Sequence, residues 1–489
     1  MSSREQKNVL LICTDHWSGL LTGYGGHPVV MTPTIDQLAH CGVAYDRAYS
    51  ACPSCIPARR SLYTGLSPRA HHLRTYREGV ALPEVPTLAE LFRRAGYQTY
   101  CVGKLHVSPQ RDRVGFDDVL LEEQGRHQFN DVPDGDADDW EMYLAEQGFG
   151  GQEYAGGMTQ NSWVTRAWHL PERCHPVNWA VREMCRAIRR RDPRKPGFWY
   201  LSFSAPHPPL TPLQAYVDLY RDVELDAPVT ADWSANFEGW PHHLKTLANT
   251  ANEPLARARP HELVLTRRAY YATLTHIDHQ IRVVLGYLRE NGLLDDTVVV
   301  FTSDHGHMAG EHGMFCMTPF YEMSAKIPLV VVPATGDERI TPGSRDDRLV
   351  EFGDIAPTLL DLADVEIPAH MDRISALSDT RREYLYGEHG EGKAAMRMVH
   401  DGRYKLIYYP VGNRSQLFDV SADPCDAHDL SANAAHAADL QRLTGRLMAE
   451  LYGEDTGWMK DDKLIGLPDE RFTPSGDLSL RGQRGLRFP

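Results

Sequence analysis

A cysteine and an arginine four residues apart, Cys55 and Arg59, begin a short helical pattern that ends at Gly65. Pro57 lies between them. The backbone N–H groups at the start of a helix, together with a guanidinium group, favour a bound oxyanion. These residues therefore predict a reactive group at position 55, held at a helix N-terminus beside an anionic ligand.

Further polar residues follow four apolar segments, each with the pattern of a buried strand. The strands are expected at Asn8–Cys13, Tyr97–Val102, Phe198–Phe203 and Thr297–Thr302. In chain order, the polar residues after them are Asp15, His16, Lys104, His106, His207, Asp304, His305 and His307. Because ligands of open α/β sheets bind beyond the carboxyl ends of the strands, we expect these side chains to meet at one edge of a sheet.

The residue types in this set can hold a cation and an anion together. Asp15 and Asp304, each with a histidine beside it, predict a site for a divalent cation that is made mostly of oxygen ligands. The donors expected around a tetrahedral oxyanion are Arg59, Lys104, His106 and His207. Positive charges positioned in this way stabilise the charge that develops in a transfer reaction.

The rest of the sequence has the pattern of a frame that could position these residues. Apolar runs alternate with amphipathic stretches, which is typical of an α/β sheet covered by helices on both faces. A fifth buried strand is expected at Ile327–Val332. The clearest helices are expected at Thr87–Ala95, Trp179–Arg190, Arg267–Asn291 and Asp354–Ala363.

The pattern changes late in the chain. Met396–Tyr409 alternates like antiparallel strands and Ser431–Leu451 has the pattern of a helix, so we expect a smaller C-terminal α+β subdomain. The predicted division is a catalytic α/β domain at 1–374 and the C-terminal subdomain with a tail at 375–489. Irregular composition predicts insertions in the first domain at about 122–165 and 208–262.

Composition excludes several classes of protein. The 489 residues have a formal net charge of −15, which argues against a general nucleic-acid binder. No apolar run reaches the roughly 18 residues that a membrane span needs, and no secretory signal is seen at the N-terminus. Nine irregularly spaced cysteines argue against a disulfide framework. We therefore expect a cytoplasmic protein without a membrane segment.

The order of the motifs resembles that of type I sulfatases, the formylglycine-dependent family within the alkaline phosphatase-like superfamily. The matching motifs are Cys55-x-Pro57-x-Arg59, Gly103-Lys104-x-His106, Ala205-Pro206-His207, Ser303-Asp304-His305-Gly306 and Gly310-Glu311-His312-Gly313. The resemblance covers residues 8 to about 363, and Tyr404–Ile407 and Gln416–Val420 resemble the family's C-terminal subdomain. It implies a large mixed, mostly parallel sheet sandwiched by helices.

By this resemblance, a maturation enzyme converts Cys55 to formylglycine, whose aldehyde hydrates to a gem-diol. One hydroxyl attacks sulfur and releases the alcohol, and the second then expels sulfate. Arg59 would hold the diol, Lys104 and His106 the diol and sulfate, and His207 the leaving-group side.

The resemblance also implies a metal site. The implied ligands are Asp15, His16, residue 55, Asp304 and His305. Ca²⁺ is the ion that the family favours. His16 and His305 stand where many relatives carry carboxylate or amide ligands, and such a softer site leaves Mn²⁺ or Mg²⁺ as alternatives.

One departure from the family pattern concerns the leaving group. Met317 stands where relatives carry a lysine, and a thioether can neither donate a proton nor carry charge. His312 or His207 would then act alone on the leaving group, or the leaving group needs little protonation. Phe315 and Met317 are candidates for an apolar substrate pocket, and Glu388 and His389 for contacts from the C-terminal subdomain.

The leading hypothesis is hydrolysis of a sulfate monoester, either a small molecule or a saccharide. Phosphonate monoesters and phosphodiesters also carry a single negative charge, so a hydrolase of those esters with the same nucleophile is the main alternative. A binding protein that kept the fold and lost catalysis is a third. The sequence leaves the natural substrate open, and homo-oligomerisation is an untested expectation.

Overall fold

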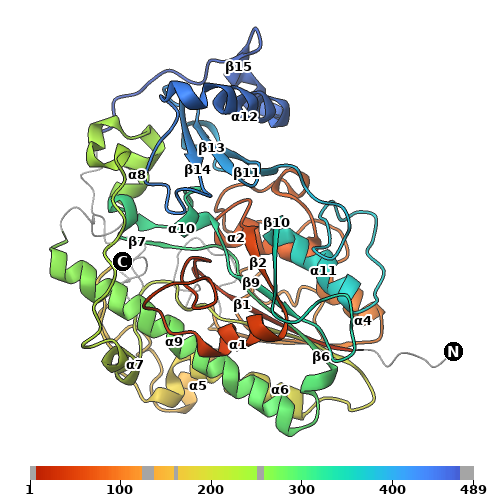
Figure 1. The fold of residues 1–489 in the computed structure, drawn as a ribbon. Coiled ribbons are helices and arrows are strands. Elements are labelled where there is room, and N and C mark those ends of the chain that lie inside the picture. Colours follow the sequence, from red (N-terminus) through yellow and green to blue (C-terminus); the bar gives the residue numbers. More distant parts are fainter. Residues whose placement is uncertain (1–6, 124–136, 159–162, 251–257, 474–489) are drawn as a thin grey trace.

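The computed structural model describes residues 7–123, 137–158, 163–250 and 258–473, and its centre is a mixed sheet of eight strands (Figure 1). In spatial order the strands are β10 (Ser344–Glu351), β2 (Val43–Tyr49), β9 (Leu329–Val332), β6 (Thr297–Ser303), β1 (Asn8–Thr14), β5 (Gly197–Ser202), β3 (Gln98–Gly103) and β4 (Asp118–Leu121). β9 is antiparallel to both neighbours, and the other adjacent pairs are parallel. The predicted fold class, a mixed and mostly parallel sheet, is confirmed.

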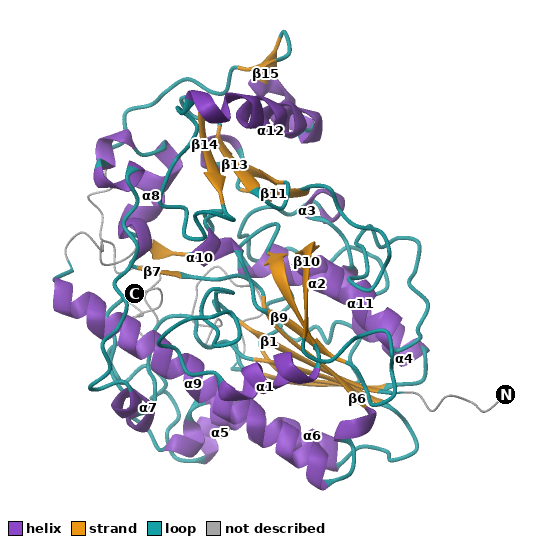
Figure 2. Cartoon of the chain, viewed as in Figure 1, coloured by secondary structure: helices purple, strands orange, loops and turns teal. Residues whose placement is uncertain are grey.

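Side chains of the central strand point alternately into two apolar layers. In β1, Leu10 and Ile12 pack into one layer, and Val9 and Leu11 into the other. All seven residues of β1 are buried, as expected for a parallel strand covered on both faces. The covering helices on the first face are α1 (Pro33–Cys41), α5 (Asp139–Glu146), α6 (Pro176–Arg189), α7 (Gln214–Leu219) and α9 (Pro260–Glu290), and on the second α2 (Cys55–Thr64), α4 (Leu88–Arg94) and α11 (Ile355–Leu362) (Figure 2).

All five strands expected from apolar runs are present, with small shifts at their ends. β9 begins at Leu329 and not at Ile327, because Pro328 has no N–H group to donate to the ladder. Three strands of the main sheet, β2, β4 and β10, were not predicted. β10 carries exposed charged residues over its first half, and this hides it from a search for apolar runs.

Two predicted helices begin earlier than expected. α6 starts at Pro176 and α9 at Pro260, and in each the proline occupies the first turn, where its missing N–H group is not needed. α9 therefore extends into the segment 208–262, which also contains α7 and α8 (His242–Thr250). Within the predicted insertions, residues 124–136, 159–162 and 251–257 lie outside the described residues.

A second, antiparallel sheet forms the predicted C-terminal α+β subdomain. Its strands are β11 (Leu385–His389), β12 (Met396–His400), β13 (Tyr404–Tyr409) and β14 (Arg414–Asp419), and α12 (Ala437–Glu450) packs on its middle strands. The subdomain has its own apolar core, which includes Leu406 and Leu447. Figure 1 shows this subdomain on the side of the molecule towards which β10 points. The exact division at residue 375 stays a prediction.

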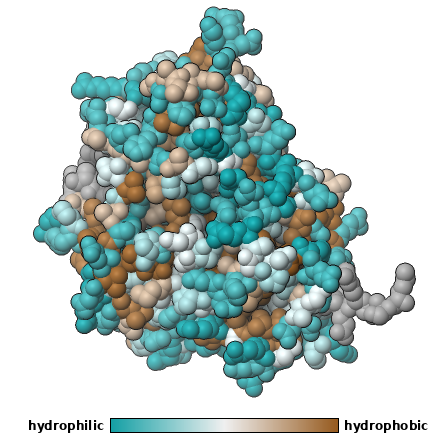
Figure 3. All heavy atoms as spheres, viewed as in Figure 1, coloured by the Kyte–Doolittle hydropathy of each residue, from teal (hydrophilic) through white to brown (hydrophobic). Residues whose placement is uncertain are grey.

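Shorter elements complete the described chain: α3 (Pro68–His71), α10 (Glu322–Ala325), the hairpin of β7 (Met308–Ala309) and β8 (Phe315–Cys316), and the hairpin of β15 (Met459–Lys460) and β16 (Lys463–Leu464). None of the described helices combines the length and apolar character needed to cross a bilayer, even the 31-residue α9. On the face shown in Figure 3, hydrophilic residues are intermixed with apolar ones.

A buried ion-pair network joins the C-terminal subdomain to the main sheet. Lys405 Nζ in β13 lies 2.8 Å from Glu322 Oε1 in α10 and 3.0 Å from Asp426 Oδ2, and all three residues are buried. Tyr49 at the end of β2 donates a hydrogen bond of 3.0 Å to Glu322. The network therefore connects the two sheets through charges that have no access to water.

We expect Lys405→Met to destabilise the protein by about 3–5 kcal/mol, because it leaves two carboxylates buried without their cation. Urea unfolding measures this. The matched control is Lys326→Met, since Lys326 Nζ lies 3.7 Å from the same Glu322 but its side chain is 22% exposed. A loss of about 1 kcal/mol or less is expected there. Equal losses in the two variants would contradict a structural role for the network.

Candidate active site

The predicted site residues come together at the carboxyl edge of the parallel strands. Asp15 and His16 follow β1, Lys104 follows β3, and Asp304 and His305 follow β6. Cys55 is the first residue of α2. His16 has a φ of 67° and His106 a φ of 60°, in the left-handed region that non-glycine residues seldom adopt. Such backbone strain persists where the surrounding structure imposes it, and it is often found at functional sites.

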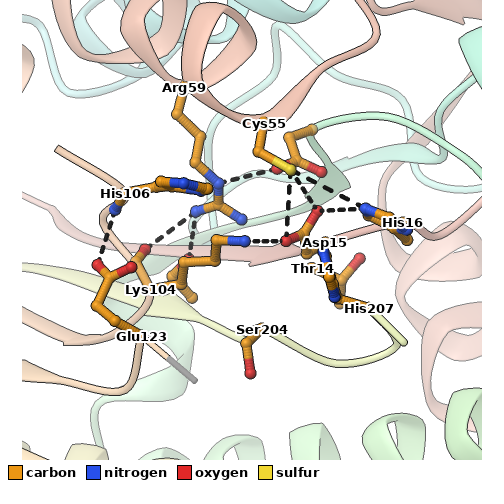
Figure 4. A network of polar contacts seen from close by, with 12 residues as sticks. Thr14, Asp15, His16, Cys55, Arg59, Lys104, His106, Glu123, Ser204 and His207 are labelled. Carbon is orange, nitrogen blue, oxygen red and sulfur yellow. Dashed lines mark hydrogen bonds and ion pairs between the residues drawn. The ribbon is translucent and has the colours of Figure 1, made fainter. Parts of the chain in front are cut away.

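Four of the five predicted metal ligands, Asp15, His16, Cys55 and His305, form one buried cluster, and Figure 4 labels the first three. Cys55 Sγ lies 3.5 Å from Asp15 Oδ1, 3.3 Å from His305 Nε2 and 4.0 Å from His16 Nε2. One potential ligand atom from each of the four residues lies within 4.8 Å of the others. A carboxylate, two imidazoles and a residue at position 55 are a donor set that fits a divalent cation.

Asp304, the fifth predicted ligand, lies at the edge of this cluster. Its Oδ1 is 3.8 Å from His305 Nε2, while its Oδ2 accepts a hydrogen bond of 2.8 Å from Arg59 Nε. Arg59 is fully buried and also donates to Lys104 O and Ser202 Oγ. Its Nη2 has no hydrogen-bond partner among the described residues. Arg59 thus fixes the ends of three strands and retains N–H groups for a ligand.

Lys104 provides the positive charge closest to the cluster, since its ammonium group contacts the Asp15 carboxylate. Burial favours the neutral acid, but Lys104 and the neighbouring histidines outweigh it and hold the pKa of Asp15 well below its usual range. Burial opposes the charge on Lys104, and Asp15 more than compensates, so the pKa of Lys104 is raised. Both groups are therefore charged at neutral pH.

The imidazole of His16 is surrounded by three other histidines. Its ring centroid lies 4.4 Å from that of His207, 4.6 Å from that of His305 and 4.8 Å from that of His307. His16 Nδ1 lies 3.0 Å from His307 Nδ1, which leaves His16 Nε2 directed to Cys55. His307 thus contacts the cluster through His16 and fixes the orientation of the His16 ring.

Sequence reasoning placed His307 at this edge without giving it a role. The signal for that role was its spacing, two residues after His305. Phe315, expected to line a substrate pocket, instead packs edge-on against the His307 ring at 4.5 Å.

His106 lies on the other side of Arg59 and Lys104 from His16 (Figure 4). Its backbone N–H donates to Glu123 at 2.8 Å, and its Nε2 is 3.4 Å from Glu78 Oε1. His207 Nδ1 lies 2.6 Å from Pro208 O, while its ring stays against His16. Both histidines are therefore near the predicted anion site, on opposite sides of it.

Three of the predicted substrate-binding residues have no described contact with the cluster. His312 packs between the rings of Trp233 and Tyr321, with centroids 5.0 and 5.2 Å away. Glu388 accepts a hydrogen bond of 2.7 Å from Tyr452. Met317 is half-buried after β8. His389, the fourth, is buried at the end of β11, where burial, His243, Arg397 and His305 lower its pKa to about 3.

A cavity of about 940 Å³ lies apart from this site. It is lined by Thr297, the first residue of β6, and by Val332, the last residue of the antiparallel β9. Both positions are at the opposite edge of the sheet from Asp15 and Asp304. The cavity is therefore separate from the candidate active site.

Models of two protein families match the chain. The sulfatase model matches residues 7–365, and a model of the C-terminal part of N-sulphoglucosamine sulphohydrolase matches residues 310–452. The first match covers the main sheet and all four clustered residues, Asp15, His16, Cys55 and His305. The second covers the antiparallel sheet of the C-terminal subdomain.

Three individual proteins, two relatives in sequence and one in structure, point to the same family. An arylsulfatase of Clostridium perfringens is 34% identical over 94% of this chain and 97% of its own length. A choline-sulfatase of Rhizobium meliloti is 27% identical over 89% and 85% of the two chains. The structure is also similar to that of a phosphonate monoester hydrolase of Agrobacterium radiobacter, with a TM-score of 0.77, 22% identity and coverage of 93% and 98%. The chain therefore belongs to the sulfatase family, the sulfuric ester hydrolases of the alkaline phosphatase-like fold.

Proposed function

We propose that the protein hydrolyses sulfate monoesters to an alcohol and inorganic sulfate, and that Cys55 is converted to formylglycine for this purpose. The observation that carries the proposal is the place of Cys55. It is buried at the first position of α2, in contact with Asp15, His16 and His305, inside a Cys-x-Pro-x-Arg motif. When hydrated, formylglycine supplies both the nucleophile and a route for the release of sulfate.

The surroundings of the unmodified thiol support this conversion. Burial, followed by the charge of Asp15, raises the pKa of the Cys55 thiol well above its usual range. A protonated thiol is a poor nucleophile. Because Cys55 is buried in the folded chain, the proposed maturation enzyme would act on the unfolded or nascent chain.

We infer that Asp15, His16, residue 55 and His305 hold a divalent cation, with Asp304 beside them. Such an ion supplies positive charge that stabilises the anionic group undergoing transfer. Ca²⁺ takes oxygen ligands, whereas two imidazole nitrogens make the site softer, and Mn²⁺, a first-row transition metal, accepts nitrogen ligands more readily than Ca²⁺ does. The donor set therefore favours Mn²⁺ over the Ca²⁺ expected from the family.

The cationic side chains would bind the sulfate group itself. Lys104 Nζ and the unpartnered Nη2 of Arg59 are donors that can contact its oxygens. His207, packed on His16, would face the leaving-group side. Because these donors are fixed by buried contacts before substrate binds, they need little reorganisation when charge develops.

The names of the relatives support a small substrate. The arylsulfatase and the choline-sulfatase act, by name, on small sulfate esters, and we propose a substrate of this class ahead of a saccharide sulfate. All nine cysteines are unpaired in the structure, so we also propose that the protein works in a reducing compartment such as the cytoplasm.

The second candidate function is hydrolysis of phosphonate monoesters, favoured by the structural similarity to an enzyme of that name. The deciding experiment compares kcat/KM for 4-nitrophenyl sulfate and for the 4-nitrophenyl monoester of phenylphosphonic acid, using protein matured with formylglycine. We expect a preference for the sulfate. A preference for the phosphonate by about two orders of magnitude or more, equal to roughly 2.7 kcal/mol of transition-state binding, would reverse the assignment.

A further inference from the structure

Two buried histidines next to the site have ring nitrogens without partners. His389, at the end of β11, is 6% exposed, and His243, in α8, is 7% exposed. Both ring nitrogens of His389 and Nε2 of His243 have no hydrogen-bond partner among the described residues. Buried polar atoms of native proteins are almost always paired, so an unpaired group of this kind points to a ligand.

The two imidazoles face one another from different parts of the chain. Their ring centroids are 6.3 Å apart, with 34° between the ring planes. Burial is the main cause that lowers the pKa of His389 to about 3 and that of His243 to about 4. Each ring is therefore neutral at ordinary pH and offers one N–H donor and one acceptor.

Contacts of the backbone place the pair beside residue 55. Glu388 N, in β11, donates a hydrogen bond of 2.8 Å to Ala51 O, in the loop that leads to Cys55. The end of β11 therefore lies beside the segment that carries Cys55, one of the four clustered residues.

Helix α8 lies next to the end of β11, since its His243 ring faces that of His389. It packs against β8, whose Phe315 contacts the ring of His307 and so supports His16. Met317 follows β8 directly and cannot donate a hydrogen bond. Within the described part of the chain, the rings of His243 and His389 thus bring unpaired nitrogens to this side of the cluster.

We propose that His243 and His389 bind the leaving group of the substrate, an aryl oxygen, by donating hydrogen bonds to it as the S–O bond breaks. The electron pair of that bond passes to the aryl oxygen, which leaves as an aryloxide and takes its proton from the water consumed in hydrolysis. Neutral imidazoles stabilise this negative charge without giving up a proton. They therefore select phenolic over alkyl leaving groups, whose alkoxides are far more basic. This proposal rests on the proposed function and names its substrate class.

The test uses the dependence of the rate on the leaving group. The matured enzyme and the variants His389→Phe, His243→Phe and His389→Gln are compared on 4-nitrophenyl sulfate and phenyl sulfate. Nitrophenolate spreads its charge over the ring, whereas phenolate concentrates it on oxygen. Loss of one donor to a developing oxyanion lowers rates by about 10²–10³-fold. We expect a loss near that range on phenyl sulfate for the phenylalanine variants and a loss below about fivefold on 4-nitrophenyl sulfate.

Two controls make the result specific. His389→Gln retains an N–H donor and should recover much of the activity on phenyl sulfate. His242→Gln changes the neighbouring histidine of α8, whose ring lies near Phe472, and should leave both rates unchanged. Retained turnover of 4-nitrophenyl sulfate shows that each variant is folded.

Equal losses on the two esters, or no loss on either, would overturn the role of the pair. If the wild-type enzyme prefers phosphonate monoesters, the same comparison is made with their 4-nitrophenyl and phenyl esters. In that case the proposed sulfatase function is wrong, but the comparison still tests whether His243 and His389 bind the leaving group. A matured wild type that hydrolyses neither class of ester refutes both.

Discussion

Replacing Cys55 with alanine is expected to remove turnover, by about 10⁴–10⁶-fold in kcat, which is the range for loss of an enzyme's nucleophile. Alanine cannot be converted to an aldehyde, so no nucleophile forms at the start of α2. The fold should survive, because only a small side chain is removed from a helix whose ten residues are all buried. Initial rates on 4-nitrophenyl sulfate and the thermal unfolding midpoint measure the two effects.

Cys52→Ala is the matched control for this variant. Cys52 is also buried and lies three residues before Cys55, in the loop that leads to α2, but it is not among the four clustered residues. It should retain full activity. Comparable activity in wild type and Cys55→Ala, both freshly purified, would rule out any covalent role of residue 55.

The second large effect is expected from Asp15→Asn. Asp15 contacts Cys55, Lys104, His16 and His305, so the substitution removes the only carboxylate in the four-residue cluster and leaves Lys104 without its counter-charge. Residues that merely orient metal ligands contribute about 10–100-fold, and Asp15, which we propose as a direct ligand, should contribute more, near 10³-fold in kcat/KM. Elemental analysis of the purified protein should show about one Mn²⁺ per wild-type chain and almost none in the variant.

Asp278→Asn separates metal loss from a general loss of stability. Asp278 is a largely buried carboxylate in α9 that accepts hydrogen bonds from the backbone of Thr34 and Ile35, at the start of α1. Its asparagine variant should keep its metal. Undiminished metal content in Asp15→Asn would show that the cluster is not the metal site, and one Ca²⁺ per chain in the wild type would reverse the preference for Mn²⁺.

Strands buried on both faces were predictable, since their apolar runs have no other stable environment. β1, β3, β5 and β6 occur where expected, and the residues that follow them supply most of the candidate site. β10 was not predictable in this way, because it lies at the edge of the sheet and half of it faces water. Its pairing with β2 is fixed by tertiary contacts that local sequence does not encode.

The sequence predicted which residues could do chemistry better than it predicted the contacts that hold those residues in place. Arg59 was expected to bind an anion, yet three of its contacts hold Asp304 and the ends of β3 and β5. His243 gave no signal at all, because its segment has an irregular composition and its neighbour in space, His389, is almost 150 residues away. Such pairs arise from the meeting of two subdomains, and only the folded chain reveals them.

The buried ion pairs of the site explain how a chain with a net charge of −15 can bind an anionic ester. Lys104 and Arg59 are buried and ion-paired with Asp15 and Asp304, so their charges act at short range where water is excluded. A bound cation would add to this local positive charge. The overall field of the protein matters less there, since solvent ions screen it within about 10 Å.

The most direct test of the formylglycine mechanism is the mass of the peptide that contains residue 55. The protein is produced together with a formylglycine-generating enzyme, digested, and measured by mass spectrometry alongside Cys55→Ala. We predict that the wild-type peptide is lighter than the unmodified peptide, by the mass difference between a CH₂SH group and an aldehyde group. We also predict that kcat is proportional to the fraction of Cys55 that has been converted. Full activity in protein whose residue 55 is entirely unmodified cysteine would contradict this mechanism.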